Sequence, residues 1–279
     1  MDINLTFKSN NKILIMNKTS EFKILSISGI STIENEISTS NINGSGVSVT
    51  GQKMASRDIT VKFDIKKNDN EDLNRDNVLH FFNINNSGTL TITRNNVSRK
   101  IDYIVKSIKE TSKYMIEWQQ FTIDLLCADP LYKSIDDYNK NIAEIGGLFT
   151  FPLVLLESGK PMGYRIFNEN IVIENDGAVA TGVIVTFNAT GSVVKPRFTI
   201  NGEFIEVNLT MELGDTLVIS TNNRNKYIKL NGENVMQKMN RQSIFVQLAV
   251  GTNTIGYSAE SGATNCAVNV VFNKQYMGV

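Results

Sequence analysis

"GTLTITR" (residues 88–94) and "KIDYIVK" (residues 100–106) place their large apolar side chains two positions apart. In the first stretch Leu90 and Ile92 share one face, and in the second Tyr103 shares a face with the Ile and Val on either side of it. A period of two is typical of a half-buried antiparallel strand, since successive side chains point to opposite faces of a sheet. These stretches therefore predict a mainly β protein.

The same half of the chain contains one segment with helical spacing, NEDLNRDNVLHFFN (residues 70–83). Leu73, Val78 or Leu79, and Phe82 recur near the period of an α-helix, behind acidic residues suited to a helix N-terminus. A run of turn-forming residues, NINNSG, follows it. We therefore predict one helix near 70–83 within an N-terminal β-sandwich or barrel.

Residues 134–150 interrupt the alternation and include Gly146 and Gly147, which places a linker and a domain boundary there. The prediction is an N-terminal domain of residues 1–140 and a C-terminal domain of residues 141–279. The second domain contains short strands at regular spacing. They are predicted over 171–175, 181–190, 197–207, 215–221, 226–236, 244–250, 253–258 and 266–273.

Two Asn-Gly pairs, Asn201-Gly202 and Asn231-Gly232, lie between apolar flanks in this second domain. Such pairs favour the positive φ angles of tight β-hairpins. Together with the strand spacing they predict a β-sandwich or jelly roll.

Composition excludes several classes of function. Basic and acidic residues number 28 each, so no basic surface for sequence-specific nucleic-acid binding is predicted. The N-terminus alternates apolar with polar residues, unlike a signal peptide, and no apolar run reaches the roughly 18 residues of a membrane span. We expect a soluble protein that is made in the cytoplasm.

The inventory of reactive side chains predicts no catalytic residue, no cofactor and no metal. The only histidine, His80, lies on the predicted helix, whereas Cys127 continues the buried face of a strand and Cys266 lies in the other domain. The acidic segment 68–76 lacks the glycine that a calcium loop of the EF-hand type requires. A hydrolase built on two of Asp58, Asp64, Asp124 and Asp129 is the weakest alternative, because any acidic sequence offers such pairs.

The stretch "CADPLYK" (residues 127–133) combines a thiol, a carboxylate and a phenol, yet it is better explained as the end of a strand. Asp129 and Pro130 favour a corner that stops the strand, and Leu131 with Tyr132 is expected to hold that corner against the core. The strand before it is expected to carry a β-bulge at Gln119–Gln120, where the apolar register changes from even to odd positions.

Carbohydrate binding stays open as an alternative function, because β-sandwiches often bind glycans through exposed aromatic side chains. The second domain has no tryptophan, however, and its Tyr227 and Tyr257 fall within strand patterns. A lectin-like module for attachment to the host cell wall is therefore the second hypothesis.

The order of several stretches resembles the distal tail (Dit) protein family of long-tailed phages that infect Gram-positive hosts. The resemblance covers almost the whole chain, and it rests on the following stretches: NGSGVSVTG (43–51), RDITVKFDI (57–65), GTLTITR, RKIDYIVKSI (99–108), QFTIDLLCADPLY (120–132), GGLFTFPL (146–153), IENDGAVATGVIVTF (173–187), LGDTLVISTNNRNKYIKLNG (213–232) and SIFVQLAVGTNTIGYS (243–258). Two departures are Leu131, where the family often has a larger aromatic, and the Ser and Val that replace the acidic end of the glycine loop.

The resemblance implies a structural hub protein of the virion, at the tip of the phage tail, and not an enzyme. It implies a homo-hexameric ring formed by the N-terminal domain, a galectin-like C-terminal sandwich, and assembly in the cytoplasm of the bacterial host. The implied partners are the tail tube protein, a tail-tip or tail-associated protein, and a receptor-binding or accessory baseplate protein, and the ring would leave a channel for DNA.

A closed ring requires two different complementary surfaces on each subunit, which a free strand edge or a long hairpin arm can supply. The candidate ring-interface or loop positions are Gly44, Gly46, Gly51, Arg57 and Asp58, and the domain-exit corner is Asp129 with Pro130.

Overall fold

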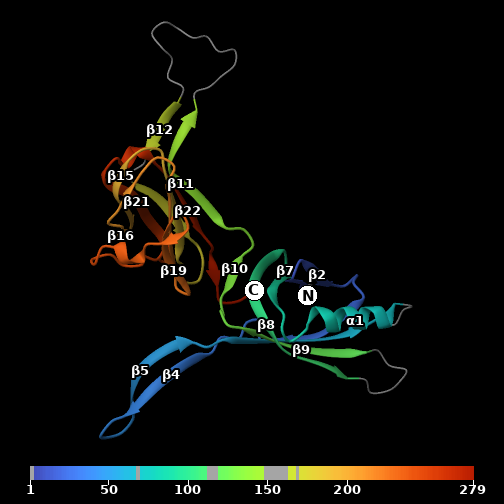
Figure 1. Ribbon diagram of the computed structural model, residues 1–279. Coiled ribbons are helices and arrows are strands. Elements are labelled where there is room, and N and C mark those ends of the chain that lie inside the picture. The colour runs from blue at the N-terminus through green and yellow to red at the C-terminus, as the bar shows by residue number, and fades with distance from the viewer. Residues whose placement is uncertain (1–2, 67–69, 112–118, 148–162, 168–169) are drawn as a thin grey trace, which may run out of the picture. The chain divides into compact units, whose positions relative to one another are not determined.

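The computed structural model describes residues 3–66, 70–111, 119–147, 163–167 and 170–279. The chain divides into two compact units (Figure 1). The first comprises Met1–Ile135 together with Tyr276–Val279, and the second comprises Asp136–Gln275. The last four residues thus belong with the N-terminal unit, which the sequence did not suggest.

The first unit contains one α-helix among its described residues, and its strands confirm the mainly β prediction. Its elements are β1 (Ile3–Ser9), β2 (Lys12–Met16), β3 (Phe22–Ser28), β4 (Asn35–Asn41), β5 (Val47–Met54), β6 (Arg57–Ile65), α1 (Glu71–Phe81), β7 (Ser87–Arg94), β8 (Val97–Thr111), β9 (Gln120–Cys127), β10 (Tyr132–Ser134) and β23 (Gln275–Tyr276), the last beginning one residue before the unit boundary.

Most of these strands form one antiparallel sheet in the order β2-β1-β7-β8-β9-β6-β3, in which β10 also pairs with β8, and β23 pairs with β10. The two stretches that predicted the fold are β7 and β8, which pair as a hairpin from Arg94 and Val97 to Ser87 and Ile104. Asn95 and Asn96 at its turn both have positive φ, of 48° and 66°. An Asn-Asn pair therefore makes here the kind of positive-φ turn that was expected of the Asn-Gly pairs.

The helix contributes to the core of the first unit through its C-terminal end. Val78 and Phe82 have no exposed surface, and the ring of Phe82 meets that of Phe7 edge to face at 5.0 Å. Leu73, by contrast, is 61% exposed, so its expected place on the buried face is wrong. The helix packs on the sheet by its last turns only, because the buried residues gather near its C-terminal end.

The expected β-bulge at Gln119–Gln120 needs correction. Gln120 pairs in regular register with Asp64, and the irregularity of this region lies in β8 instead, between Val105 and Ser107. The earlier part of the expected bulged strand, residues 114–118, lies outside the described residues. The two units divide between Ile135 and Asp136, within the expected linker over 134–150, and the strand β11 (Tyr138–Gly147) of the second unit occupies most of that range.

The second unit is a sandwich of two antiparallel sheets. Its elements are β11, β12 (Gly163–Phe167), β13 (Asn170–Asn175), β14 (Val183–Ala189), β15 (Val193–Ile200), β16 (Glu203–Glu206), β17 (Thr210–Met211), β18 (Thr216–Asn222), β19 (Asn225–Leu230), β20 (Glu233–Asn234), the 3-10 turns Met236–Lys238 and Ala263–Asn265, β21 (Gly251–Ser261) and β22 (Cys266–Phe272). One sheet has the order β12-β11-β22-β14-β18-β19-β20, and the other has the order β13-β21-β15-β16 with β17 beside β15.

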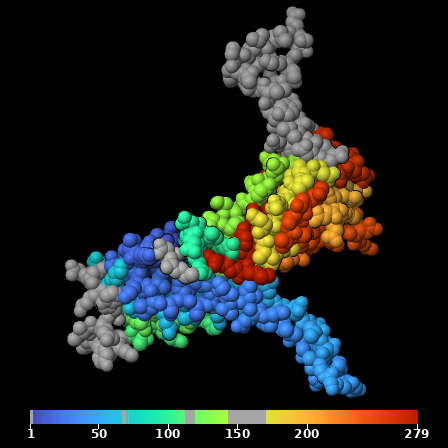
Figure 2. Space-filling model, turned by 180° about the vertical axis from the view of Figure 1, so that it is seen from behind, coloured from blue at the N-terminus to red at the C-terminus, as the bar shows by residue number. Residues whose placement is uncertain are grey.

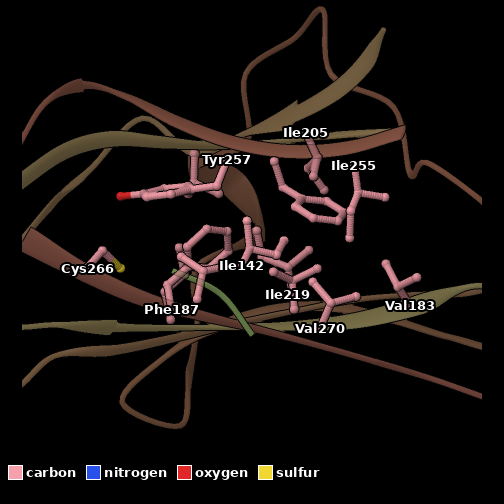
Figure 3. Close-up of a cluster of buried hydrophobic side chains, with 14 of the residues drawn as sticks. Ile142, Val183, Phe187, Ile205, Ile219, Ile255, Tyr257, Cys266 and Val270 are labelled. Carbon is pink, nitrogen blue, oxygen red and sulfur yellow. The ribbon is translucent and has the colours of Figure 1, made fainter. Parts of the chain in front are cut away.

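The core of the sandwich lies between these two sheets (Figure 3). Alternate side chains of β14 and β22 point into it, such as Phe187 and Val270, and the ring of Tyr257 meets that of Phe187 at 5.5 Å. Both Asn-Gly pairs form the predicted tight turns, with positive φ at all four residues. This architecture agrees with the predicted β-sandwich.

One predicted strand of the second unit is not part of a sheet. Residues 244–250 run beside the sandwich without forming a ladder. Leu248 and Thr181 exchange backbone hydrogen bonds of 2.8 and 3.0 Å, and the backbone N–H of Ile244 donates to the carbonyl of Phe204 at 3.1 Å. Val246 and Leu248 are nevertheless buried. The alternation therefore predicted correctly which side chains face inward, although the backbone of this segment does not pair with a neighbouring strand along its length.

Candidate assembly site

The hairpin of β4 and β5, hereafter the arm, is the most exposed element of the first unit. Every residue of both strands is exposed to solvent. The arm extends away from the rest of its unit as a slender blue ribbon in Figure 1, and the same projection is visible from behind in Figure 2. It contains the glycine loop that the sequence singled out.

The arm has two chemically different faces. One carries the apolar side chains Ile37, Val47, Val49 and Met54, which are between 41% and 61% exposed. The opposite face carries serines and the Lys53–Glu36 ion pair, with Nζ and Oε2 2.8 Å apart.

A β-bulge creates this asymmetry. The strand register shifts between Ser38 and Thr39, so that Thr50 is the extra residue on β5. Successive side chains alternate between the faces of a hairpin, and one extra residue reverses that alternation. Val49 and Met54, which are five residues apart, consequently lie on the same face.

The predicted glycine positions have two different roles in the arm. Gly44 and Gly46 lie at its tip with φ of 136° and 101°, in backbone conformations that other residues rarely adopt. Gly51 lies within β5, opposite Ser38, and an added Cβ there would meet no atom within 4 Å. These glycines shape the hairpin and leave its surface open.

Arg57 does not lie on a loop or an open surface, because its residue is only 3% exposed. Its guanidinium donates hydrogen bonds to four backbone carbonyl oxygens: Nε to Pro130 at 2.9 Å, Nη1 to Gly29 at 3.1 Å and Ile30 at 2.5 Å, and Nη2 to Met277 at 2.7 Å. It also lies over the ring of Tyr132, 4.8 Å from the centroid. A subunit in this conformation therefore cannot offer Arg57 to a neighbour.

Asp58, the next residue, is exposed. Its carboxylate pairs with Lys106, whose Nζ lies 2.9 Å from Oδ2, and it raises the pKa of that lysine through the hydrogen bond and its charge. Both side chains are more than half exposed, so water screens the pair and its contribution to stability is small. Asp58 remains accessible to another molecule.

The corner of CADPLYK follows β9 directly. The strand ends at Cys127, and the Asp129 carboxylate then accepts a hydrogen bond from the backbone N–H of Leu131 at 3.3 Å. Tyr132 is fully buried and donates its hydroxyl to the carbonyl of Ile30 at 3.0 Å. Tyr132 holds the corner against the core, while Leu131 is only partly buried.

The thiol of Cys127 is unsuited to nucleophilic chemistry. It has no exposed surface, and burial raises its pKa to about 12, so the thiol stays protonated at neutral pH. His80 is exposed on α1. Among the residues that the structure describes, no three His, Cys, Asp or Glu side chains gather as a metal site would require.

The carboxylates considered for a hydrolase have structural partners. Asp124 accepts hydrogen bonds from the hydroxyl groups of Thr60 and Ser107, both at 2.7 Å, and Asp64 accepts one from Gln120 at 3.3 Å.

No helix in the described part of the chain is long and apolar enough to cross a membrane.

A depression of about 380 Å³ in the second unit gathers charged side chains from β15, β16 and β21. Its charges satisfy one another: Arg197 donates to Glu206 at 2.7 Å, and Lys195 pairs with Glu260 at 2.5 Å. Tyr257, one of the two tyrosines weighed for glycan binding, is part of the core, and Tyr227 is half-buried. These features do not single out a carbohydrate site.

Two regions of the chain match sequence models of phage tail domains. The sequence model of the phage tail protein RIFT-related domain matches residues 11–127, and that of the siphovirus-type tail component, C-terminal domain, matches residues 176–276. No curated protein matches the sequence.

Two solved structures resemble the whole chain. The crystal structure of the Dit protein of phage SPP1, described as a paradigm of the hub adsorption apparatus in phages that infect Gram-positive bacteria, matches with a TM-score of 0.69 and 14% identity, over 97% of this chain and 98% of that chain. The baseplate of phage P2 in its activated conformation with calcium matches with a TM-score of 0.49 and 10% identity, over 100% of this chain and 99% of that chain.

The fold and the family matches together define a structural component of a phage tail, not an enzyme. The chain belongs to the distal tail (Dit) family of siphovirus-type tail components, the structural hub of the baseplate, and it is therefore a protein of the virion.

Proposed function

We propose that this hub is a closed ring of six copies, which joins the tail tube to the tail-tip protein and leaves a channel through which DNA passes. The arm carries this proposal. It is a long exposed hairpin with one apolar face, which no other part of the described chain covers.

An arm of this kind is poorly suited to remain in solvent. An isolated two-stranded hairpin is marginally stable in water, and exposed strand edges are normally protected by charged residues or proline. Between Ile37 and Gln52 the arm has neither. A second copy of the chain that packs on the arm would bury its apolar face and could also shield its strand edges.

A ring also explains why only one side of the arm is apolar. In a closed heterologous assembly each subunit contacts one neighbour through one surface and the other neighbour through a different surface. A projecting element therefore needs only one face that binds the neighbouring subunit. The exposed Asp58 and the glycine positions 44, 46 and 51 are proposed to lie at or near this contact. Arg57 is not among the contacting residues, because it is buried within its own subunit.

The remaining partners follow from the hub position. We propose that the first unit contacts the tail tube and the tail-tip or tail-associated protein, and that the second unit holds a receptor-binding or accessory baseplate protein. Assembly is proposed to take place in the host cytoplasm, before the virion is complete.

A pair of charge substitutions on opposite faces of the arm tests the ring. Val49→Asp places a carboxylate on the apolar face, and Ser48→Asp places one on the serine face of the same strand. Light scattering coupled to size exclusion should give a hexamer, or a pair of hexamers, for the unmodified protein and for Ser48→Asp, and smaller species for Val49→Asp. Electron micrographs viewed down the ring axis check the symmetry.

The folding of each variant is measured in parallel, because residues without core contacts should not affect the unfolding midpoint. The proposal fails if the unmodified, folded protein is monomeric at high concentration. It also fails if Val49→Asp and Ser48→Asp assemble equally well.

A further inference from the structure

The segment between β3 and β4, residues 29–34, is the base from which the arm leaves its unit, and it is held unusually tightly. Gly29 has a φ of 84°, and a Cβ on it would lie 1.9 Å from the carbonyl oxygen of Asp58. Only glycine allows this approach to β6. Ile30, the next residue, packs partly buried against the core of the unit.

Arg57 holds this base from inside the unit. Two of its four hydrogen bonds go to the carbonyl oxygens of Gly29 and Ile30, and the Ile30 carbonyl also accepts the hydroxyl of Tyr132. The other two bonds go to Pro130 at the corner and to Met277 near the C-terminus. A single side chain therefore joins three segments that are far apart in the sequence.

Such a junction is energetically demanding. A buried guanidinium must have its N–H groups satisfied, since an unpaired buried charge is costly. The planar fork of arginine reaches several acceptors in fixed directions, which the ammonium of lysine cannot reproduce. Each of the three segments is consequently needed to supply carbonyl acceptors for the N–H groups of Arg57.

Residues 276–279, hereafter the clasp, supply one of these segments, and two more arginines hold them. Arg99 lies over the ring of Tyr276, 3.7 Å from its centroid, and donates to the carbonyl of Gly278, while Arg94 donates to that of Val279 at 3.4 Å. The clasp is thus joined to the arm base through Arg57, which donates to Met277 as well as to Gly29 and Ile30.

We propose that Arg57 and the clasp are positioning residues for the arm: by fixing the arm base, they set the direction in which the arm leaves the subunit. Any event that displaces the clasp, which directly follows the last residues of the second unit in the chain, would release the arm from its fixed direction. This inference concerns the single subunit and does not depend on the ring.

The experiment measures distances within one chain by pulsed electron paramagnetic resonance. Spin labels are placed at Ser48→Cys on the arm and Lys62→Cys on β6, because both positions are exposed, whereas Cys127 and Cys266 are buried. All samples carry Val49→Asp, so that no neighbour holds the arm, and labelled protein is diluted with unlabelled protein. The full chain is expected to give one narrow distance distribution.

Three changes at the junction should each cause the loss of that narrow distribution. They are Arg57→Met, removal of residues 277–279, and Arg99→Gln, which loosens the clasp without touching the arm base. Combining Arg57→Met with the removal should broaden the distribution no further than the larger single effect, because both act on one junction. Arg75→Met is the control, as this half-exposed arginine pairs with Glu110 at 3.0 Å, and it should leave the distribution unchanged.

The unfolding midpoint of every variant is recorded, since loss of the whole fold would also broaden the distances. If Arg57→Met does not fold, the truncated chain and Arg99→Gln decide the question. Narrow distributions in folded junction variants would overturn the proposal, as would equal broadening in Arg75→Met. These results leave the ring proposal untouched, since it is tested by oligomeric state.

Discussion

Replacement of Phe82 by Ala tests whether the helix supports the N-terminal unit through its last turn. Phe82 has no exposed surface, and its ring contacts those of Phe7 and Phe81 at 5.0 and 4.9 Å. Removing a buried Phe side chain costs about 3–5 kcal/mol of stability. Each edge-to-face ring pair contributes about 0.5–1.5 kcal/mol beyond the stabilisation from the buried area. We expect a loss near the upper end, about 4–5 kcal/mol.

Calorimetry of the full chain is the appropriate assay, since two compact units should unfold in separate transitions. A domain of this size shifts its Tm by roughly 3–4 °C per kcal/mol, so the transition of the first unit should fall by about 12–20 °C. The transition of the second unit should not move. Phe187→Ala, in the sandwich core, should show the reverse pattern.

Leu73→Ala is the matched control on the same helix. Leu73 is 61% exposed, so its loss should change stability by no more than about 0.5 kcal/mol. The reasoning is refuted if Leu73→Ala costs as much as Phe82→Ala, or if Phe82→Ala lowers the first transition by less than about 1 kcal/mol.

Three further predictions concern the first unit. Gly29→Ala should destabilise it by more than about 1 kcal/mol, because the new Cβ meets the Asp58 carbonyl, while Gly51→Ala on open space should be nearly neutral; denaturant titration distinguishes them. Burial raises the pKa of the Cys127 thiol from 9.0 to about 12. The thiol therefore contributes fully to stability below pH 9, and this contribution is lost as the pH rises toward 12. Cys127→Ala should cost some stability at neutral pH but make the loss of stability at alkaline pH less steep. Hydrogen bonds from the hydroxyl groups of Ser107 and Thr60 lower the pKa of Asp124 below 3.8. The contribution of this carboxylate to the free energy of unfolding is therefore present above that pH and is lost as the pH falls further. Asp124→Asn should reduce the acid sensitivity of the unfolding midpoint.

Local patterns determined much of this protein. The period of two in β7 and β8 and the Asn-Gly pairs of the second unit depend on interactions between near neighbours, and the structure contains the strands and turns that they predict. The buried position of Cys127 was also predictable, since Cys127 continues the apolar face of its strand. The corner after it ends β9 where Asp129 and Pro130 indicated.

Some errors arose where one pattern has two explanations. Alternation over 244–250 correctly marked Val246 and Leu248 as buried, yet burial does not require a partner strand. Helical spacing included Leu73, because a period specifies a face of the helix but not how much of its length is covered. Residues 138–147 looked like a linker although they form a strand.

Only the tertiary structure decided the features on which the two proposals rest. The sidedness of the arm depends on a bulge at Thr50, where a single extra residue brings Val49 and Met54 to one face. The role of Arg57 depends on carbonyl groups 28, 27, 73 and 220 positions away in the chain. No local pattern carries such information, because backbone carbonyls are present at every residue and only folding selects which of them meet one guanidinium.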